Sequence, residues 1–386
     1  MGDAPDGQAR LPAARTVSDR TPARAAVLRT QGGKFLVEPI SIEAPRNDEV
    51  LVRVRAAGLC HTDLIARDQL YPVPQPIVLG HEGAGIVERV GAGVTKVAPG
   101  DRVVMSFLAC GTCPNCRAGA PAYCAELFGL CFGGCRPDGS SALADDHGGL
   151  LHGHFFGQSS FATHAMASER NVVKLPDTIP FELAAPLACG LQTGAGAVLN
   201  VLRPRLGESI ALFGAGAVGL SAVMAAKAIG AGPVIVVDPN PARLALALEL
   251  GADLTIDPTA LDPVATIRKQ YGGARFSLEA TGRADVLRQA IDALMPRGVC
   301  GIVGAPALGV EACFDVSDVM VGGKTIRGIV EGDSVPDRLI PELIRLHAEG
   351  LFPIEKLVRT YTLDQINDAV ADAEAGTVVK PVIVFA

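Results

Sequence analysis

The segment ESIALFGAGAVG, residues 208–219, decides the fold of this chain. Its apolar start runs directly into three glycines, Gly214, Gly216 and Gly219, and an alanine-rich stretch of helical composition follows. A second apolar run then ends in Asp238, 19 residues beyond Gly219. A strand, a glycine turn, a helix, a second strand and an acidic residue at this spacing predict a doubly wound parallel sheet that binds a dinucleotide.

Each glycine has its own task in such a turn. Gly214 allows the tight turn, Gly216 lets the backbone approach a pyrophosphate, and Gly219 permits close packing of helix on strand. The first turn of the helix offers free N–H groups to the phosphates. Asp238 would accept hydrogen bonds from ribose hydroxyls and repel a 2′-phosphate, which favours NAD over NADP. The alternative is a tight turn in an ordinary α/β sheet.

The pattern of apolar runs and turn residues changes near this motif. Residues 191–330 alternate between apolar strand-like runs and helical stretches, which predicts a parallel sheet flanked by helices. Residues 25–190 carry short β-like runs separated by turn residues, and 331–386 contain one helical stretch and a last strand. We therefore expect an α/β protein with a mainly β catalytic domain (25–190 and 331–386), a dinucleotide-binding domain (191–330) and a disordered extension (1–24).

Composition disfavours several classes of protein. The 386 residues are 49% hydrophobic and 19% charged, which suits two packed domains better than a disordered chain. A net charge of −7 without a basic block disfavours nucleic-acid binding. We find no signal-like apolar segment and no uninterrupted run suited to a membrane. We expect a cytoplasmic protein whose ten cysteines serve metal binding or catalysis rather than disulfides.

Four of the cysteines form a compact motif. The segment CGTCPNCRAGAPAYC, residues 110–124, places them at spacings of two, two and seven intervening residues. Four thiolates fill every position of a tetrahedral zinc ion and leave none for water or substrate, which is typical of a structural site. The motif predicts a structural zinc on Cys110, Cys113, Cys116 and Cys124, with disulfides as the alternative.

A catalytic zinc needs three protein ligands and one open position. Three separate segments offer candidates: Cys60 in GLCHTDLIA, His81 in LGHEGAG and Cys189 in LACGLQTG. Each residue alone is more typical of a buried core position. Together, two cysteines and one histidine make a ligand set that suits a catalytic zinc.

These motifs jointly carry a resemblance to a known family. Over residues 25–386 the chain resembles the zinc-containing medium-chain alcohol dehydrogenases, in GLCHTDL, LGHEGAGIV, the four-cysteine lobe, ACGLQTGAGAV, FGAGAVGL and VKPVIVF. Within that family it resembles the bacterial aryl-alcohol (benzyl-alcohol) and geraniol branch, in LHGHFFGQSSFATHA and TIRGIVEGDSVPDRLIPELI. The resemblance implies a GroES-like catalytic domain beside a Rossmann domain, two Zn²⁺ per subunit, and NAD-dependent oxidation of an alcohol to an aldehyde.

The resemblance also assigns residues around the catalytic metal. It makes Cys60, His81 and Cys189 the zinc ligands, and it places the carboxylates of Glu82 and Asp63 beside them. Asp63 would orient His81 through the second ring nitrogen, as metal-bound histidines usually require.

Five further residues would contact substrate or cofactor by the same resemblance. Thr62 would hydrogen-bond the substrate oxygen, and His61 and Lys380 would contact the cofactor pyrophosphate. Thr193 would lie against the nicotinamide, and Arg243 near the adenosine ribose. For Arg243 and Lys380 the alternative is a solvated surface charge.

The segment around Cys60 carries two more expectations. Extended backbone would turn Cys60 and His61 to opposite sides, so that this pair is not a chelate. Ile65 stands where many relatives have a histidine that ends a proton relay. We therefore expect the proton to leave from the cofactor ribose to water, or through His61.

Three aromatic residues point to the substrate. By resemblance Phe107, Phe155 and Phe156 line the substrate channel, and three rings there favour an aromatic or unsaturated substrate. The alternative is that they are ordinary core residues. Benzyl-type primary alcohols are the leading prediction, allylic terpenoid alcohols such as geraniol come next, and a glutathione adduct of formaldehyde is third.

Rival functions and the assembly stay open at this stage. A non-catalytic zinc-binding interaction module would need one zinc, and a zinc-free reductase relative would lack a catalytic ligand. The long segment between Cys124 and Phe155 resembles that of dimeric relatives, so we expect a homodimer rather than a tetramer, with no nucleic-acid or membrane partner. Cys131 and Cys135 in that segment receive no role.

Overall fold

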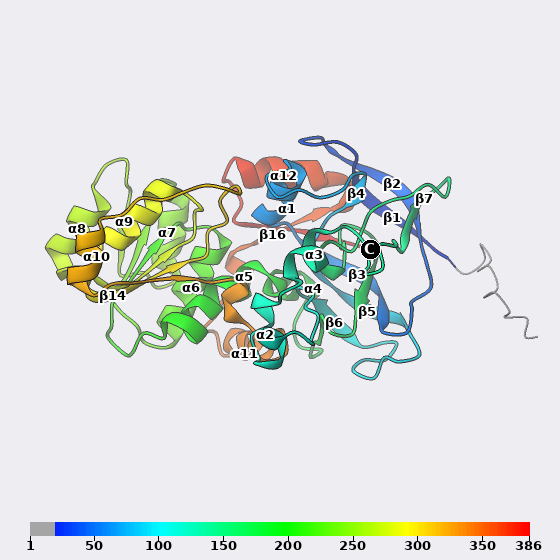
Figure 1. The fold of residues 1–386 in the computed structure, drawn as a ribbon, viewed down its shortest axis with the longest axis horizontal. Coiled ribbons are helices and arrows are strands. Elements are labelled where there is room, and N and C mark those ends of the chain that lie inside the picture. The colour runs from blue at the N-terminus through cyan, green and yellow to red at the C-terminus, as the bar shows by residue number, and fades with distance from the viewer. Residues whose placement is uncertain (1–19) are drawn as a thin grey trace, which may run out of the picture.

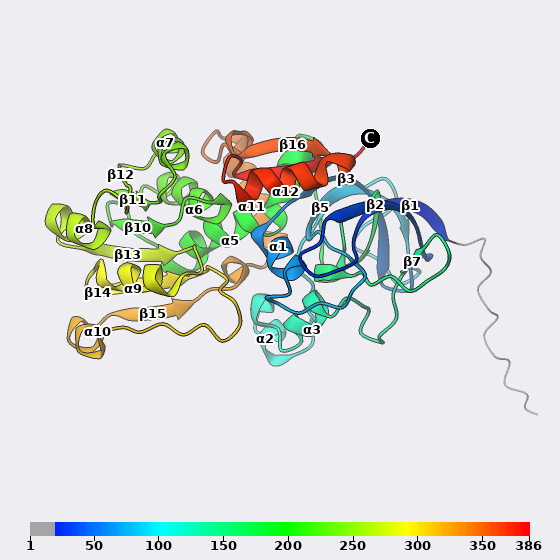
Figure 2. The ribbon, with the colours of Figure 1, turned by 90° about the horizontal axis from the view of Figure 1, so that it is seen from above.

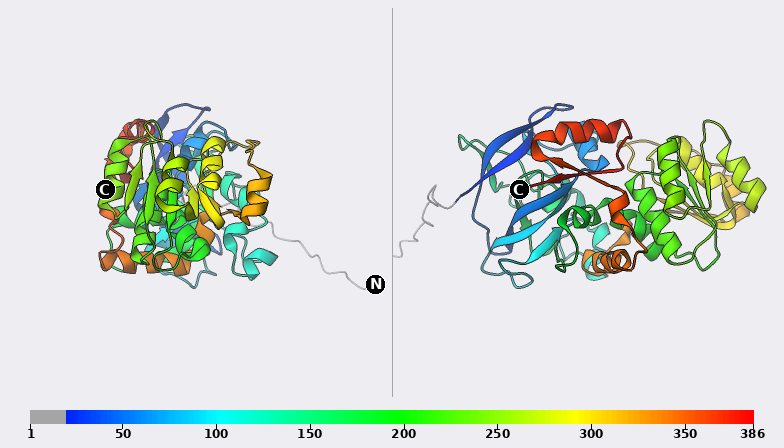
Figure 3. Two further views of the ribbon diagram at one scale, coloured as in Figure 1. Left: turned by 90° about the vertical axis from the view of Figure 1, so that its left-hand side faces the viewer. Right: turned by 180° about the vertical axis from the view of Figure 1, so that it is seen from behind.

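The computed structural model describes residues 20–386, which form two lobes side by side along the long axis of the molecule (Figure 1). One lobe is built on two β-sheets and the other on a single six-stranded sheet. The C-terminal segment returns to the first lobe, so the chain leaves that lobe, builds the second one and comes back (Figure 3).

The six-stranded sheet is entirely parallel, in the order β12-β11-β10-β13-β14-β15. Both faces are covered: Ile210 and Leu212 of β10 belong to one apolar cluster, and Ala211 and Phe213 to another. A strand covered on both faces must be continuously apolar, as this one is. The reversal of strand order on either side of β10 confirms the doubly wound fold class expected from the glycine motif.

The elements of this lobe have the following bounds. The strands are β10 (Ile210–Phe213), β11 (Val234–Val237), β12 (Leu254–Ile256), β13 (Ala274–Glu279), β14 (Leu294–Ile302) and β15 (Thr325–Gly328). The helices are α6 (Ala217–Ala228), α7 (Pro241–Glu249), α8 (Pro263–Tyr271), α9 (Ala284–Asp292) and α10 (Val316–Gly322).

The other lobe combines a four-stranded sheet, β4-β1-β2-β7, with a larger sheet, β16-β17-β3-β5-β6-β9, in which β8 also pairs with β3. Its first strands are β1 (Thr21–Leu28), β2 (Phe35–Ile42), β3 (Glu49–Gly58), β4 (Ile77–Val78), β5 (Glu82–Val90) and β6 (Arg102–Met105). The others are β7 (Leu143–Asp145), β8 (His164–Ser168), β9 (Val172–Lys174), β16 (Val358–Thr362) and β17 (Lys380–Val384). Its helices are α1 (His61–Arg67), α2 (Pro114–Arg117), α3 (Leu127–Phe132), α4 (Phe181–Ala184), α5 (Gly190–Gly196), α11 (Pro336–Ala348) and α12 (Ile366–Glu374).

Two of these elements matter most for the site. Strand β17 pairs antiparallel with the end of β3, which brings the last strand of the chain beside the segment that holds Cys60. Helix α5 lies at the junction between the lobes (Figure 2) and packs against α6. No single helix within residues 20–386 is long and apolar enough to cross a membrane; Phe181–Ala188 and Gly190–Leu202 qualify only as a pair bent by 59°.

The position of strand β1 corrects the predicted boundary between the N-terminal extension and the first domain. Thr21–Leu28 pair with β2, so residues 21–24 belong to a sheet rather than to the disordered extension predicted for 1–24. Ala25, Ala26, Val27 and Leu28 are fully buried, and this burial of apolar surface stabilises the strand. The remainder of that prediction, residues 1–19, lies outside the described residues.

Helix α1 shows that the extended backbone predicted at Cys60 and His61 is wrong from His61 onward. Cys60 is extended, with φ −118° and ψ 157°, but it is the N-cap of the helix, and His61 is the first helical residue. The carboxylate of Asp63, three residues into the segment, accepts a hydrogen bond from the Cys60 N–H at 3.0 Å, as in a capping box. The motif therefore encodes a helix start rather than a strand.

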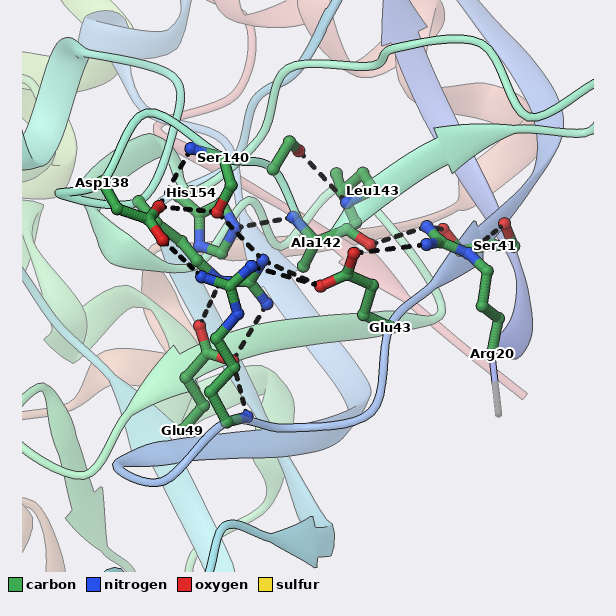
Figure 4. Close-up of polar contacts among 12 residues, drawn as sticks. Arg20, Ser41, Glu43, Glu49, Asp138, Ser140, Ala142, Leu143 and His154 are labelled. Carbon is green, nitrogen blue, oxygen red and sulfur yellow. Dashed lines mark hydrogen bonds and ion pairs between the residues drawn. The ribbon is translucent and has the colours of Figure 1, made fainter. Parts of the chain in front are cut away.

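A buried ion-pair network fixes the long segment that precedes Phe155 (Figure 4). The Arg136 guanidinium, 5% exposed, donates two hydrogen bonds to Glu49, at 2.5 and 3.0 Å. Beside it, the His154 ring accepts a hydrogen bond from Ala142 N. Burial, together with the charge of Arg136, lowers the pKa of His154 to about 3, so this ring is neutral. The network holds the backbone immediately before the predicted substrate-channel residues.

Candidate functional site

Three segments bring the predicted catalytic metal ligands together. Cys60 caps α1, His81 lies directly before β5, and Cys189 directly precedes α5. Their ligand atoms and a carboxylate oxygen of Glu82 all lie within 4.8 Å of one another. The pKa of Cys60 lies well below its usual value, and the largest cause is a hydrogen bond from the Cys189 thiol. The lowered pKa favours the thiolate form that a metal binds.

Asp63 connects two of these ligands. Its Oδ1 lies 3.0 Å from His81 Nδ1 and also accepts a hydrogen bond from Gly80 N at 3.0 Å, while Oδ2 binds Cys60 N. The side chains of Asp63 and His81 are both fully buried. His81 Nε2 is buried without a hydrogen-bond partner in the described part of the chain. A ring nitrogen orphaned among two thiols fits a metal ligand whose orientation is set through the other nitrogen.

Glu82 and Lys380 form a buried ion pair beside the cluster. Lys380 Nζ lies 2.9 Å from both carboxylate oxygens of Glu82, and the two side chains are 2% and 0% exposed. Glu82 Oε1 also accepts a hydrogen bond from Gly190 N at 2.9 Å. The alternative of a solvated surface charge is therefore wrong for Lys380. Because Lys380 also lines the cofactor crevice, its contact with a pyrophosphate stays a prediction.

A crevice of about 320 Å³ runs from the metal cluster to the glycine turn. Gly214 has φ +104°, in the left-handed region, and a Cβ on Gly219 would lie 1.8 Å from Gly214 O. A Cβ on Gly216 would meet nothing within 4 Å, so the backbone there borders open space. These three environments fit the tasks assigned to the glycines and leave room for a pyrophosphate at the start of α6.

The far end of the crevice has the residues expected for the adenosine half. Asp238, 6% exposed, directly follows β11 and accepts hydrogen bonds from Ala215 N at 2.7 Å and Asn240 N at 2.8 Å. Arg243 lines the same crevice, and its Nε has no hydrogen-bond partner among residues 20–386. The carboxylate is thus held rigidly at the strand end where a ribose would lie.

The remaining site residues divide between the crevice and the cluster. His61 is exposed and lines the crevice, while Thr62 Oγ1 lies 3.9 Å from Cys60 Sγ. Thr193 Oγ1 lies 3.4 Å from a carboxylate oxygen of Glu331. Thr62 therefore faces the metal cluster, and His61, one residue earlier, faces the cofactor side.

The four-cysteine motif closes on itself as predicted. The sulfur atoms of Cys110, Cys113, Cys116 and Cys124 all lie within 4.8 Å of one another, and all four thiols are free. Backbone N–H groups of Thr112 and Cys113 point at Cys110 Sγ at 3.4 and 3.3 Å and lower its pKa to about 6. Donors aimed at sulfur favour thiolates, so this donor set fits a structural zinc.

The predicted aromatic channel is only partly assembled. The rings of Phe155 and Phe156 lie 5.5 and 4.5 Å from the ring of His81, so both border the metal cluster. Phe132 of α3 joins them, 5.5 and 5.2 Å away, a contact that sequence reasoning missed. Phe107 is buried but lines a separate outer cavity of about 500 Å³, so the structure does not place it with the other two at His81.

Sequence reasoning also missed Glu331. Its carboxylate lies 3.4 Å from Cys189 Sγ, 3.3 Å from Gln192 Nε2 and 3.4 Å from Thr193 Oγ1. Burial raises the pKa of Glu331 to about 7. The available signal was its position, three residues beyond β15, since ligands of doubly wound sheets bind at the carboxyl ends of the strands.

Comparison with known proteins agrees with this geometry. Residues 46–177 match the family "Alcohol dehydrogenase GroES-like domain", and residues 217–349 match "Zinc-binding dehydrogenase". The geraniol dehydrogenase of Castellaniella defragrans is 50% identical over 366 residues, which cover 94% of this chain and 98% of that protein.

Solved structures extend the likeness to three dimensions. A zinc-binding-domain alcohol dehydrogenase protein from Burkholderia ambifaria is 56% identical with a TM-score of 0.94, covering 95% of this chain and 100% of that one. The benzyl alcohol dehydrogenase of Acinetobacter calcoaceticus is 48% identical with a TM-score of 0.92 at the same coverage. A putative zinc-binding dehydrogenase from Sinorhizobium meliloti, bound to NADP, is 26% identical with a TM-score of 0.79. This chain belongs to the zinc-binding alcohol dehydrogenase family, whose members are NAD-dependent oxidoreductases with a GroES-like domain.

Proposed function

We propose that this protein oxidises primary aryl or allylic alcohols to aldehydes with NAD⁺, and that it catalyses the reverse reduction. One observation carries the proposal. The orphaned Nε2 of His81 lies within 4.8 Å of the thiols of Cys60 and Cys189, and Cys60 lines a crevice that reaches the glycine turn. This arrangement offers three ligands to a catalytic zinc and places them where a bound dinucleotide would end.

The two bound groups supply the chemistry, and the chain supplies the positions. Zinc supplies a Lewis acid that eases loss of the alcohol proton, and NAD⁺ accepts the hydride. Asp63 holds His81 in the orientation that a metal requires, and the Glu82–Lys380 pair keeps a second carboxylate neutralised beside the cluster. Thr62 would bind the substrate hydroxyl, a role that its contact with Cys60 Sγ at 3.9 Å supports.

Proton release takes a route set by this chain. Ile65 is 2% exposed within α1 and offers no base. His61, four residues earlier, is exposed in the cofactor crevice and can pass a proton to water. We infer that the proton passes from Thr62 and the cofactor ribose to His61 or to solvent.

Aromatic packing supports the substrate class. Phe155 and Phe156 border His81, and both are almost fully buried, so they make the surroundings of the metal cluster apolar and aromatic, which suits an aromatic or unsaturated alcohol. The geraniol and benzyl alcohol dehydrogenases that resemble this chain are named for substrates of this kind. Benzyl-type alcohols lead, geraniol-type alcohols follow, and a glutathione adduct of formaldehyde is third.

The cofactor proposal is NAD rather than NADP. Asp238 keeps a carboxylate at the end of β11, and such a group repels a 2′-phosphate. The NADP bound to the Sinorhizobium relative belongs to a protein only 26% identical, so it does not decide the preference here.

The assembly proposal is a cytoplasmic homodimer. Strand β15 ends the six-stranded sheet, and one of its edges has no strand partner among residues 20–386. Large apolar side chains gather on the neighbouring segment and are exposed: Leu308, Val310, Phe314, Val316, Met320 and Val321. Exposed apolar patches of this kind mark interfaces, and a second copy would cover both the patch and the edge.

A substrate panel tests the proposal. We expect kcat/KM for NADH formation to be highest with benzyl and cinnamyl alcohol, then geraniol, and lowest with ethanol. Cyclohexylmethanol is the matched control for benzyl alcohol, since it has the same size without the aromatic ring. Equal or better rates with ethanol, or a strict need for glutathione, would contradict the substrate class.

A further inference from the structure

A cavity of about 540 Å³ lies apart from the catalytic site, beside the four-cysteine lobe (residues 110–124). Its walls come from Gly119, Ala120 and Tyr123 of that lobe, from the π-helix Ala197–Leu202 that follows α5, and from the first turns of α11. No predicted ligand of either zinc lines this cavity, and it shares no lining residue with the cofactor crevice. The roles assigned so far therefore leave the cavity unexplained.

The cavity has an excess of positive charge. Five charged side chains line it: Arg203, Arg327, Arg338, Asp333 and Glu342. Both acids already have partners. Asp333 pairs with Arg327 at 2.6 Å, and Glu342 pairs at 2.6 Å with Arg345, which lies outside the cavity. Arg203 and Arg338 are exposed, and their guanidinium groups form no hydrogen bond or ion pair among residues 20–386. Two cations thus remain for a ligand.

The backbone that leads to Arg203 is unusual. The residues before it form a π-helix, Ala197–Leu202, and Arg203 itself has φ +48°, in the left-handed region. Both conformations are uncommon for residues other than glycine, and both occur often at functional sites. The chain thus adopts a strained conformation at the point where it places this arginine in the cavity wall.

The rest of the lining is largely apolar. Leu199, Val335 and Leu339 contribute aliphatic side chains, and Tyr123 contributes a ring whose hydroxyl already donates to Asp333. Pockets that bind small molecules typically measure about 300–1,000 Å³, so this cavity has room for a ring or a short chain. The lining therefore suits a ligand that joins an apolar body to an anionic group.

We propose that this cavity binds a carboxylate carried on an apolar body, and that Arg203 and Arg338 hold the carboxylate. Guanidinium groups match the two oxygens of a carboxylate with paired N–H donors. Oxidation of an aldehyde gives an acid of this class, which is the product one step beyond the proposed reaction. The choice of an aryl acid as the probe rests on the proposed function, whereas the site itself does not.

Calorimetric titration of the zinc-loaded protein with benzoate tests the proposal. Benzamide has the same ring without the charge, and acetate has the charge without the ring. We expect benzoate to bind at least about tenfold more tightly than either, since burial of a ring and hydrogen bonds to a charged group each contribute about tenfold or more. Inorganic phosphate should bind more weakly than benzoate.

Arg203→Met and Arg338→Met remove the charge and keep an unbranched apolar side chain. We expect each variant to raise the Kd for benzoate at least about tenfold and to keep the wild-type kcat/KM for benzyl alcohol. Arg117→Met is the matched control. Arg117 is an exposed arginine of the same four-cysteine lobe that does not line the cavity, so its variant should keep the wild-type Kd.

An unchanged Kd for benzoate in both cavity variants would place the binding elsewhere, such as at the catalytic metal, and would overturn the inference. Binding of benzamide, acetate or phosphate as tight as that of benzoate would overturn it as well. Either result leaves the proposed function intact, because the alcohol panel measures that function separately. Failure of the alcohol panel with intact benzoate binding would overturn the proposed function alone.

Discussion

Replacing Asp63 with asparagine isolates the support of the catalytic metal site. The Asp63 carboxylate accepts three hydrogen bonds, from Cys60 N, Gly80 N and His81 Nδ1, each at 3.0 Å. Asparagine keeps one acceptor oxygen and replaces the other by an NH₂ group. At least one buried donor would then face another donor.

The size of the effect follows from that mismatch. A buried polar group left without its partner costs about 1–3 kcal/mol. Loss of the partner of a metal-bound histidine typically weakens metal binding by about 10–100-fold, which corresponds to about 1.4–2.8 kcal/mol. The two magnitudes agree, so we expect Asp63→Asn to weaken one zinc by that factor and to leave the four-cysteine site unaffected.

Chelator competition with a colorimetric zinc indicator measures this effect. Wild type should hold two zincs per subunit at a chelator concentration where Asp63→Asn holds one. Asp68→Asn is the matched control, since Asp68 ends the same helix and pairs with Arg67 at the surface. Full retention of both zincs by Asp63→Asn, or earlier loss of the four-cysteine zinc, would refute the reasoning.

Three further predictions follow from single side chains. Ile65→His should raise alcohol oxidation below about pH 8 if a missing relay limits the rate; pH profiles of kcat measure this, and an unchanged profile would show that no relay is missing. Lys380→Met leaves the buried Glu82 carboxylate unpaired, so the midpoint of urea unfolding should fall by the equivalent of about 3–5 kcal/mol, whereas a midpoint equal to wild type would contradict the pairing. The pKa of His154 falls from 6.5 to about 3 on folding. Its contribution to stability is therefore fully present above pH 6.5 and is lost by about 1.4 kcal/mol per unit as pH falls toward 3. His154→Gln should flatten this acid limb in unfolding measurements, and an acid limb as steep as in wild type would exclude His154 as its source.

Local features of the sequence predicted the doubly wound fold and the four-cysteine cluster, whereas the catalytic ligands on three distant segments were assigned by the family resemblance. The glycine turn is encoded within a dozen residues, because a positive φ at Gly214 and the tight approach at Gly219 depend on the immediate chain. The four cysteines likewise meet through short-range turns. Features of this kind need no knowledge of distant contacts.

Contacts between distant segments explain what the sequence could not predict. The partner of Lys380 is Glu82, 298 residues earlier, and only the pairing of β17 with β3 brings them together. Glu331 likewise reaches Cys189 across 142 residues. Neither the Glu82–Lys380 contact nor the Cys189–Glu331 contact produces a local pattern in the sequence.

One error in the prediction has a different origin. Extended backbone was expected at Cys60 and His61, yet the capping carboxylate of Asp63 starts a helix at His61. The place of Phe107 in the substrate channel, which the resemblance implied, stays a prediction; Phe107 lines an outer cavity and belongs to the same apolar cluster as Phe155 and Phe156.

The metal content of wild type and His81→Ala tests the central claim most directly. His81 supplies the orphaned nitrogen on which the catalytic site depends, and it is remote in sequence from the four-cysteine motif. The account predicts two zincs per subunit in wild type, and one zinc with no alcohol-dependent NADH formation in the variant. Equal zinc content in the two proteins, or a single zinc in wild type, would contradict it.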